Sequence, residues 1–455
     1  MKGLEKIIIN ERLVENIKHH IAQKDHETLI KLIDWVRAPD MADLMEHLDH
    51  EERLYLMDLF EAGDAGEVLI EIETPVQESI IRNLEDEAVS EIVQQLESDD
   101  AADLLGTLPY DRVKKIIDSV EDEVSERIER LLPYPEDTAG GNMALEFVAV
   151  QEDSTIKDAI ETIRKKRDAV KNVYYLFVVD HLNRLMGVVS LKDLVLESPE
   201  RRINEIMNPE VISVNANKDQ EKVYHLFKRY DLVAIPVVDH QNRLIGRITH
   251  DDILDVIEDE ADEDISLMAG VIHQEITEDS LMKISRARLP WLIAGLLGGI
   301  LAALVINRFE SSLERMITLS FFFPVVMAMG GNAGTQSASI AVRGLATGDI
   351  RLVLIWKRLF MEMKVAFLNG IICGILLGVI VGFWLSDYGL GFVVTLSLIV
   401  IILNSGFIGA AMPLVFKKFG VDPALATGPF VTTSNDIFSL FIYLALVTIY
   451  LRIAA

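Results

Sequence analysis

The residue with the most conspicuous chemistry is Asp436, a carboxylate inside the last long apolar stretch of the chain. Residues 427–451 form a run of 25 in which Asp436 carries the only formal charge. At a helical rise of about 1.5 Å per residue, such a run can cross the hydrocarbon core of a bilayer, which is about 30 Å thick. An aspartate at that depth costs about 2.5–3.5 kcal/mol on insertion scales, so it normally faces a partner or water. We therefore predict an ion site, the alternative being a protonated carboxyl bonded to a neighbouring helix.

Neutral polar side chains accompany this carboxylate. Thr432 and Asn435 precede it in the same run, and Asn332 lies in a second apolar span with the sequence GGNAGTQS at 330–337. Polar groups are tolerated at membrane depth only where protein covers them or where they line water. We expect Asn332, Thr432, Asn435 and Asp436 to line a pore, although glycines and serines in membrane helices also serve close packing.

Five apolar spans are expected, near residues 290–306, 317–341, 352–384, 390–416 and 425–451. Pro324 and the glycines at 330–334 predict an interrupted second span, and Gly428 with Pro429 predicts a disturbed start of the last span. Basic residues flank the first span, the second-to-third connection and the end of the fourth: Lys283, Arg286, Arg288, Arg343, Arg351, Lys357, Arg358, Lys417 and Lys418. By the positive-inside rule the N-terminus is cytoplasmic and the C-terminus lies outside a plasma or inner membrane that the chain crosses several times.

Charge is distributed very unevenly along the 455 residues. The first 288 residues hold 64 acidic and 33 basic side chains, a net charge of −31, whereas the rest is slightly basic. This acidity excludes nucleic acid as a partner and favours a cation. The single cysteine, Cys373, lies in an apolar run, so we expect neither a disulfide framework nor a cysteine metal site, and the first residues do not resemble a signal peptide.

A twelve-residue repeat covers residues 28–132. Its first apolar column is Leu44, Leu56, Val68, Ile80, Ile92, Leu104, Ile116 and Ile128, and its second is Leu48, Phe60, Ile72, Leu84, Leu96, Leu108, Val120 and Leu132. The i, i+4 spacing predicts a stack of short helices that bury both columns on one face, as a regulatory lever or as a scaffold. Asp99, Asp100 and Asp103 open one unit, either as helix-capping residues on a solvated face or as metal ligands.

Two segments with an α/β pattern follow, FVVDHLNRLMGVVSLKDLV at 177–195 and PVVDHQNRLIGRITHDDIL at 236–254. Each predicts a strand, an Asn-Arg turn, a second strand and a helix opened by Ser or Thr. They resemble a CBS-domain pair. In that family the Ser/Thr-x-x-Asp end can hold the ribose of an adenine nucleotide, which implies Ser190 with Asp193, Thr249 with Asp252, and Lys192 for a phosphate. Ser190 and Thr249 are equally good helix caps.

The next segment is the most acidic of the chain. Nine carboxylates stand between residues 251 and 264, and several of them recur at i, i+3 and i+4, where each like-charge pair costs a helix about 0.2–0.5 kcal/mol. Divalent cations would neutralise them, since carboxylate oxygens suit Mg²⁺ and Ca²⁺. The alternative is a solvated acidic helix.

The order of these parts, with PYPEDTAGGNM at 133–143, GGNAGTQS at 330–337 and GPFVTTSND at 428–436, resembles the MgtE family of magnesium channels and transporters over essentially the whole chain. The resemblance implies a homodimer with a pore on its two-fold axis, to which each subunit supplies Asp436. It implies that acidic residues sense intracellular Mg²⁺. The matching positions are Asp219, Glu221, Asp231, Asp252, Glu260, Glu263, Asp264 and Asp422, with Asp99, Asp100 and Asp103 as looser candidates. Lys192 stands where nucleotide-binding relatives tend to carry Arg.

We therefore expect a multidomain membrane protein that combines an α-helical superhelix, an α/β tandem CBS pair, an acidic connecting helix and five transmembrane helices. The expected boundaries are 1–132, 133–257, 258–288 and 289–455. The expected function is a Mg²⁺-selective channel or transporter gated by cytoplasmic Mg²⁺, with ATP as a candidate ligand and no catalytic residues. The alternative is a membrane-anchored nucleotide or ion sensor that transports nothing. An anion channel is disfavoured because the charge in the last span is negative.

Overall fold

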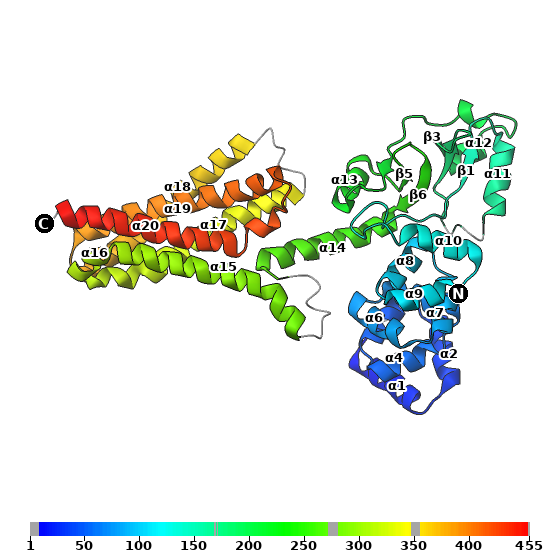
Figure 1. Ribbon diagram of the computed structural model, residues 1–455, viewed down its shortest axis with the longest axis horizontal. Helices are drawn as coiled ribbons and strands as arrows, with labels where there is room; N and C mark the ends of the chain where they lie inside the picture. The colour runs from blue at the N-terminus through cyan, green and yellow to red at the C-terminus, as the bar shows by residue number, and fades with distance from the viewer. Residues whose placement is uncertain (1–8, 168–169, 171, 272–280, 347–354, 454–455) are drawn as a thin grey trace. The chain divides into compact units, whose positions relative to one another are not determined.

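The computed structural model describes residues 9–167, 170, 172–271, 281–346 and 355–453 (Figure 1). Its internal contacts divide the chain into two compact units, Met1–Glu258 and Asp259–Ala455. The first unit holds the helical repeat and the α/β pair, and the second holds the apolar helices. Arg351, one of the flanking basic residues of the sequence argument, lies outside the described residues.

From residue 9 onward, where the structure describes the chain, ten short helices open the first unit. Those from α2 onward begin at intervals of twelve residues, as the repeat predicts. The helices are α1 Glu11–Ala22, α2 His26–Trp35, α3 Ala38–Glu46, α4 His50–Met57, α5 Ala62–Glu71, α6 Thr74–Asn83, α7 Asp86–Val93, α8 Ser98–Gly106, α9 Tyr110–Ile117 and α10 Asp122–Leu131. Local capping helps to fix the starts. At α4, for example, Asp49 accepts from the backbone N–H of Glu52 while Glu52 accepts from that of Asp49.

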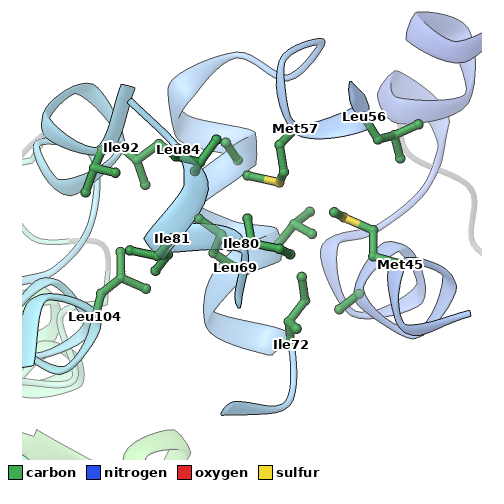
Figure 2. Packing of buried hydrophobic residues seen from close by; sticks show 14 of the residues in the cluster. Met45, Leu56, Met57, Leu69, Ile72, Ile80, Ile81, Leu84, Ile92 and Leu104 are labelled. Atoms are coloured by element: carbon green, nitrogen blue, oxygen red, sulfur yellow. The ribbon is translucent and has the colours of Figure 1, made fainter. Parts of the chain in front are cut away.

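The first apolar column is buried throughout, which confirms its role as the core of the stack. Figure 2 shows four of its members, among them Leu56, Ile80 and Leu104, within one continuous apolar cluster. The second column was predicted to share a helix face with the first, and this is wrong. Its residues lie at the C-cap of each helix or in the turn just after it, where most cover the helix end, while Leu132 is exposed.

From α3 onward, each helix of the stack packs on a helix two positions along the chain, whereas α1 packs on α2 and α4. The pairs are α3 with α5, α4 with α6, α5 with α7, α7 with α9 and α8 with α10. A side-chain contact joins second neighbours as well: Ser90 on α7 and Ser119, just after α9, share a hydrogen bond of 2.6 Å. From α3 onward, two twelve-residue repeats therefore make about one superhelical turn, and each of these helices is stabilised by a second neighbour.

The α/β part contains two small three-stranded sheets with matching topology. The first has strands β1 Ala149–Gln151, β2 Tyr175–Val179 and β3 Leu185–Ser190, and the second has β4 Val214–Asn215, β5 Ala234–Val238 and β6 Leu244–Thr249. In each, the first pair is parallel and the second antiparallel. Helices α11 Ile156–Lys165, α12 Leu191–Leu196 and α13 Gln220–Tyr230 complete the repeats.

The predicted Asn-Arg turns are present in both repeats and also join them. Asn183 and Asn242 adopt left-handed conformations with φ of 58° and 60°. The N–H of Leu185 donates to the carbonyl of Asn242, and that of Leu244 donates to the carbonyl of Asn183, both at 2.9 Å. The two hairpins thus exchange equivalent bonds, which gives the pair a local two-fold arrangement.

The acidic segment differs from its predicted bounds of 258–288. Helix α14 runs over His250–Ala269, so it begins directly after β6. Residues 272–280 lie outside the described part of the chain, and the next helix begins at Leu281. The acidic helix is therefore the terminal helix of the second α/β repeat, prolonged beyond the sheet.

Within its described residues, the second unit contains five helices long and apolar enough to cross a membrane. They are α15 Leu281–Arg308, α17 Phe323–Ala346, α18 Ile355–Leu385, α19 Tyr388–Lys418 and α20 Pro429–Ile453, with a short helix α16 Glu310–Arg315 between the first two. Helix α19 packs against α17, α18 and α20, and α15 packs against α20 (Figure 1).

The interruption predicted within the second span is wrong. Pro324 lies in the first turn of α17, after a 3₁₀ turn Ile317–Phe322, and the glycines at 330–334 are helical. Proline in the first turn removes an N–H that has no intrahelical acceptor, so it does not break the helix. Pro429 likewise begins α20.

Candidate functional site

Asp436 lies on α20 where this helix contacts the glycine-rich face of α17. Its carboxylate is half-buried, and a Cβ added to Gly331 would lie 3.9 Å from Asp436 Oδ1 and 3.8 Å from Thr432 Cγ2. Thr432 and Asn332 are exposed within the unit. One helical face thus presents a carboxylate and a hydroxyl, with an exposed amide on the neighbouring helix, which are the hard oxygen donors that Mg²⁺ prefers.

Asn435 was predicted to line a pore, but its side chain lies inside the helix bundle. It is fully buried, and its Nδ2 is so close to Gly334 that an added Cβ would lie 1.8 Å away. One residue along a helix turns the side chain by about 100°, so Asn435 points into the contact between α20 and α17 while Asp436 points to its edge.

A buried polar seam continues from Asn435 into the bundle. Ser439 and Ser405 flank Gly330, where an added Cβ would lie 2.1 Å and 3.3 Å from their hydroxyl oxygens. Among the described residues, neither hydroxyl nor either polar atom of Asn435 has a hydrogen-bond partner. Buried polar groups without partners each cost about 1–3 kcal/mol, so this seam is a costly feature of the bundle.

A second buried carboxylate in the membrane helices was not singled out by the sequence argument. Glu362 on α18 is 7% exposed, and its Oε1 lies 3.1 Å from Arg358 Nη2 one turn earlier. Ser337 on α17 donates to its other oxygen at 3.4 Å. The Arg-x-x-x-Glu spacing inside an apolar run was the available signal, because an i, i+4 pair of opposite charges can enter a membrane helix together.

In the first unit, the start of α8 meets the start of α14. Asp99 is 7% exposed, although it was expected on a solvated face or in a metal site, and Asp103 on the same helix is exposed. Burial raises the pKa of the Asp99 carboxyl well above its usual range, and repulsion from Asp252 raises it further. The pKa of Asp252 is also raised, by burial, against hydrogen bonds from Thr249. Two carboxylates from distant parts of the chain therefore repel each other in a buried place.

Charged contacts surround this carboxylate pair. Arg247 on β6 is 4% exposed, and its Nη2 lies 3.1 Å from Glu97 Oε1 at the N-cap of α8. The Ser98 hydroxyl donates to Glu146 Oε2 at 2.7 Å, and Arg127 of α10 donates to Glu146 Oε1 at 3.0 Å. No sequence signal pointed to these contacts, because Glu97 and Arg247 are 150 residues apart.

The other predicted sensor residues are dispersed. Asp219 caps α13 and pairs with Lys222 at 3.3 Å, and Glu221 lies 3.6 Å from His225 on the same helix. Asp231 is at the opposite end of this 11-residue helix, about 18 Å from Asp219 and about 15 Å from Glu221 by helical rise, so it cannot share an ion with them.

Three further acids, Glu260, Glu263 and Asp264, follow Asp252 along α14 by two to three turns. Asp422 is exposed near the start of α20 and accepts from the N–H of Ala424 at 2.6 Å. Within the described part of the chain, no three His, Cys, Asp or Glu side chains gather as a metal cluster.

The predicted nucleotide residues form two unequal pairs. Ser190 caps α12 and its hydroxyl donates to Asp193 Oδ2 at 2.6 Å, while Lys192 is exposed beside them. The hydroxyl of Thr249 donates to Asp252 Oδ2 at 3.0 Å, but Asp252 faces Asp99 of the helical stack. The first pair is the more accessible one.

The contact between α14 and α20 lies within the second unit. A Cβ added to Gly428 would lie 3.1 Å from the carbonyl oxygen of Met268 and 3.7 Å from that of Leu267. The C-terminal carbonyls of the acidic helix therefore touch the residue that precedes α20, two turns before Asp436.

Comparison with known proteins agrees with this organisation. Residues 323–446 match the family model MgtE, described as a divalent cation transporter, residues 36–137 match the MgtE intracellular N domain, and residues 143–200 and 203–259 match CBS domains.

At least three of the curated relatives are named magnesium transporter MgtE. The one from Bacillus subtilis is 37% identical over 72% of this chain and 73% of the relative, and the one from Thermus thermophilus is 40% identical over 71% and 72%. Among solved structures, the cytosolic domain of the Mg²⁺ channel MgtE in complex with ATP is similar with a TM-score of 0.51 and 33% identity, over 53% of this chain and 99% of that one. The soluble part of a magnesium transporter is similar with a TM-score of 0.50 and 28% identity, over 55% and 99%. The chain belongs to the MgtE family of divalent cation transporters.

Proposed function

We propose that this chain carries Mg²⁺ across a membrane and that Asp436 binds the ion on its way. The observation that supports this most directly is the position of Asp436, half-buried at the edge of the α17–α20 contact, with Thr432 one turn before it and the exposed Asn332 on α17. Mg²⁺ loses its water reluctantly and is usually bound by one or two carboxylates with several waters kept. A single carboxylate with hydroxyl and amide neighbours fits such a hydrated ion.

We further propose that the transporting form is a homodimer with the soluble unit in the cytoplasm and the C-terminus outside. Each chain supplies one Asp436, and a two-fold axis beside α17 and α20 would bring two of them to one ion. Lys417 and Lys418 end α19 and Arg343 lies near the end of α17, which agrees with cytoplasmic ends for these helices.

The test is Mg²⁺ uptake and binding by the Asp436→Asn variant in a cell that lacks its own magnesium transport. The amide keeps the shape and removes the charge, so we expect uptake to fall to background. Glu310→Gln is the matched control, because it neutralises an exposed carboxylate of the same unit at α16. Uptake by Asp436→Asn at the level of Glu310→Gln would refute the proposal.

We propose that cytoplasmic Mg²⁺ regulates transport through the acidic residues of the soluble unit. At high Mg²⁺ an ion between Asp99 and Asp252 would replace their repulsion by attraction and hold the helical stack against the α/β pair. Glu260, Glu263 and Asp264 on α14 are further sensor candidates, as are Asp100, Asp103 and Asp422. The contact of Met268 with Gly428 would pass a change in α14 to the start of α20.

Limited proteolysis tests this regulation. We expect protection of residues 1–283 to rise with Mg²⁺ in the natural chain, and to lose its Mg²⁺ dependence in Asp252→Asn. Protection that is indifferent to Mg²⁺ would remove the sensor role while leaving transport untouched. The converse result, Mg²⁺-dependent protection without uptake, would favour a membrane-anchored sensor that transports nothing.

For an adenine nucleotide we propose the Ser190–Asp193 end of α12, with Lys192 near the phosphates. Asp193 would accept from ribose hydroxyls there, whereas the Asp252 carboxylate is close to Asp99, which repels it. Calorimetry with ATP should show binding that Asp193→Asn abolishes and Asp252→Asn preserves. Equal loss in both variants would place the nucleotide elsewhere.

A further inference from the structure

The contact between Glu97 and Arg247 has features of a structural latch. Glu97 stands at the N-cap of α8 in the helical stack, and Arg247 lies on β6 of the second α/β repeat. Nη2 of Arg247 lies 3.1 Å from Oε1 and 3.5 Å from Oε2 of Glu97, while Nη1 donates to the carbonyl of Asn172. The guanidinium therefore joins the stack to both α/β repeats from one buried position.

The backbone of Arg247 is fixed as firmly as its side chain. Its N–H donates to the carbonyl of Ala144 at 2.9 Å, and its own carbonyl accepts from Ala144 at 2.8 Å. A buried arginine held at both ends loses little further entropy when it meets a carboxylate. Arg247 is thus a rigid positive charge directed at the start of α8.

A second contact next to it holds the same turn. The buried hydroxyl and the N–H of Ser98 both donate to Glu146 Oε2, at 2.7 Å and 3.2 Å, and the N–H of Leu145 donates back to the hydroxyl at 2.9 Å. Arg127 neutralises Glu146 from α10. The residue that follows Ser98 is Asp99, so the latch and its neighbour decide where the Asp99 carboxylate lies.

We propose that the Glu97–Arg247 latch docks the helical stack on the α/β pair without any divalent ion, and thereby sets how much Mg²⁺ is needed to complete closure. This inference rests on the regulatory part of the proposed function. The latch attracts while Asp99 and Asp252 repel, and the balance of the two determines the docked fraction at low Mg²⁺. Arg247 is therefore a positioning residue, which acts on the ion through the carboxylates it brings together.

Two substitutions separate the latch from a general effect of charge. Arg247→Gln makes the interface more negative and Glu97→Gln makes it less negative, yet both remove the same ion pair. If only the summed charge mattered, the two variants would shift the Mg²⁺ midpoint of protease protection in opposite directions. The latch predicts that both raise the midpoint, by about tenfold or more, because each variant removes the attraction that holds the helical stack on the α/β pair.

The double variant and a surface pair provide controls. The combined Glu97→Gln and Arg247→Gln substitutions should raise the midpoint by less than the two single effects together. Glu78→Gln breaks the exposed pair of Glu78 with Arg82 within α6 and should leave the midpoint unchanged. Unchanged hydrogen-exchange protection of α3 to α5 shows that the stack remains folded in every variant.

A measurement without divalent ions separates this inference from the regulatory proposal. Spin labels on exposed sites of α4 and α12, in the chain with EDTA, report the docked fraction by their distance distribution. We expect Arg247→Gln to reduce that fraction at least several-fold. An unchanged fraction, or a lower Mg²⁺ midpoint for Arg247→Gln, would overturn the latch, whereas a natural chain whose protection ignores Mg²⁺ would overturn the sensor on which it acts.

Discussion

Gly409 is the position where a single methyl group should separate two membrane helices. A Cβ on Gly409 of α19 would lie 2.1 Å from the carbonyl oxygen and 2.9 Å from the carbonyl carbon of Gly334 on α17. The atoms that this Cβ would meet belong to the backbone of Gly334, so the clash cannot be relieved by rotating a side chain. The oxygen is more than 1 Å inside ordinary contact distance, so α17 and α19 must move apart by about that much.

The expected cost of Gly409→Ala follows from this displacement. Overpacking typically costs about 1–3 kcal/mol, and a gap of about 0.5–1 Å along the rest of the contact loses a quarter to a half of its dispersion energy. The better helix propensity of alanine returns only about 0.5–1 kcal/mol. We therefore expect a net loss of stability, seen as a melting temperature lower by several degrees for the purified protein in detergent.

The control is Gly299→Ala on α15, where an added Cβ would meet no atom of the described residues within 4 Å. That variant gains the propensity of alanine without a clash and should melt at or slightly above the natural protein. If Gly409→Ala melts as high as Gly299→Ala, the close approach of α17 and α19 in the structure is wrong, and with it the burial of Asn435 against Gly334.

Two further predictions concern carboxylates. Glu362→Ala should lower the melting temperature, because it removes the carboxylate that Arg358 pairs with and the acceptor of the Ser337 hydroxyl; an unchanged melting temperature would contradict this. Burial, Asp43 and Glu67 raise the pKa of Glu71 above its ordinary 4.5, so ionisation of this carboxyl opposes folding. Its unfavourable effect on the free energy of unfolding is absent below pH 4.5 and develops as the pH rises through the raised pKa. Glu71→Gln should therefore increase hydrogen-exchange protection of α5 at pH 7 but not at pH 4, and equal gains at both pH values would contradict this.

Much of the fold could be predicted because its signals are local and repeated. The column from Leu44 to Ile128 recurs every twelve residues, so helix starts follow the same period. The five spans were predicted within a few residues of those in the structure, as in 290–306 against Ile284–Arg308. The position of the second column was predicted wrongly because its i, i+4 spacing would also fit helices one turn longer. Only the observed helix ends show that these residues cover the C-caps.

The candidate site was less predictable because orientation and long-range pairing decide it. Asn435 and Asp436 are adjacent and equally polar, and only the position of α17 determines which of them is buried. The latch joins residues 97 and 247. In the sequence Glu97 looks like the other glutamates at the N-caps of the repeat, such as Glu85, and nothing local pairs it with Arg247. The buried state of Asp99 follows from that docking. The interruption at Pro324 was predicted wrongly because the sequence alone does not distinguish a proline in the first turn of a helix from one that kinks it.

The alternate-neighbour packing of the short helices has an evolutionary consequence. Because α8 and α10 form the contact with the α/β pair at one end of the stack, helices can be added or removed in pairs at the other end without reorienting Glu97 or Ser98. Relatives should therefore differ in the length of this arm by about 24 residues at a time, while the docking end retains its geometry.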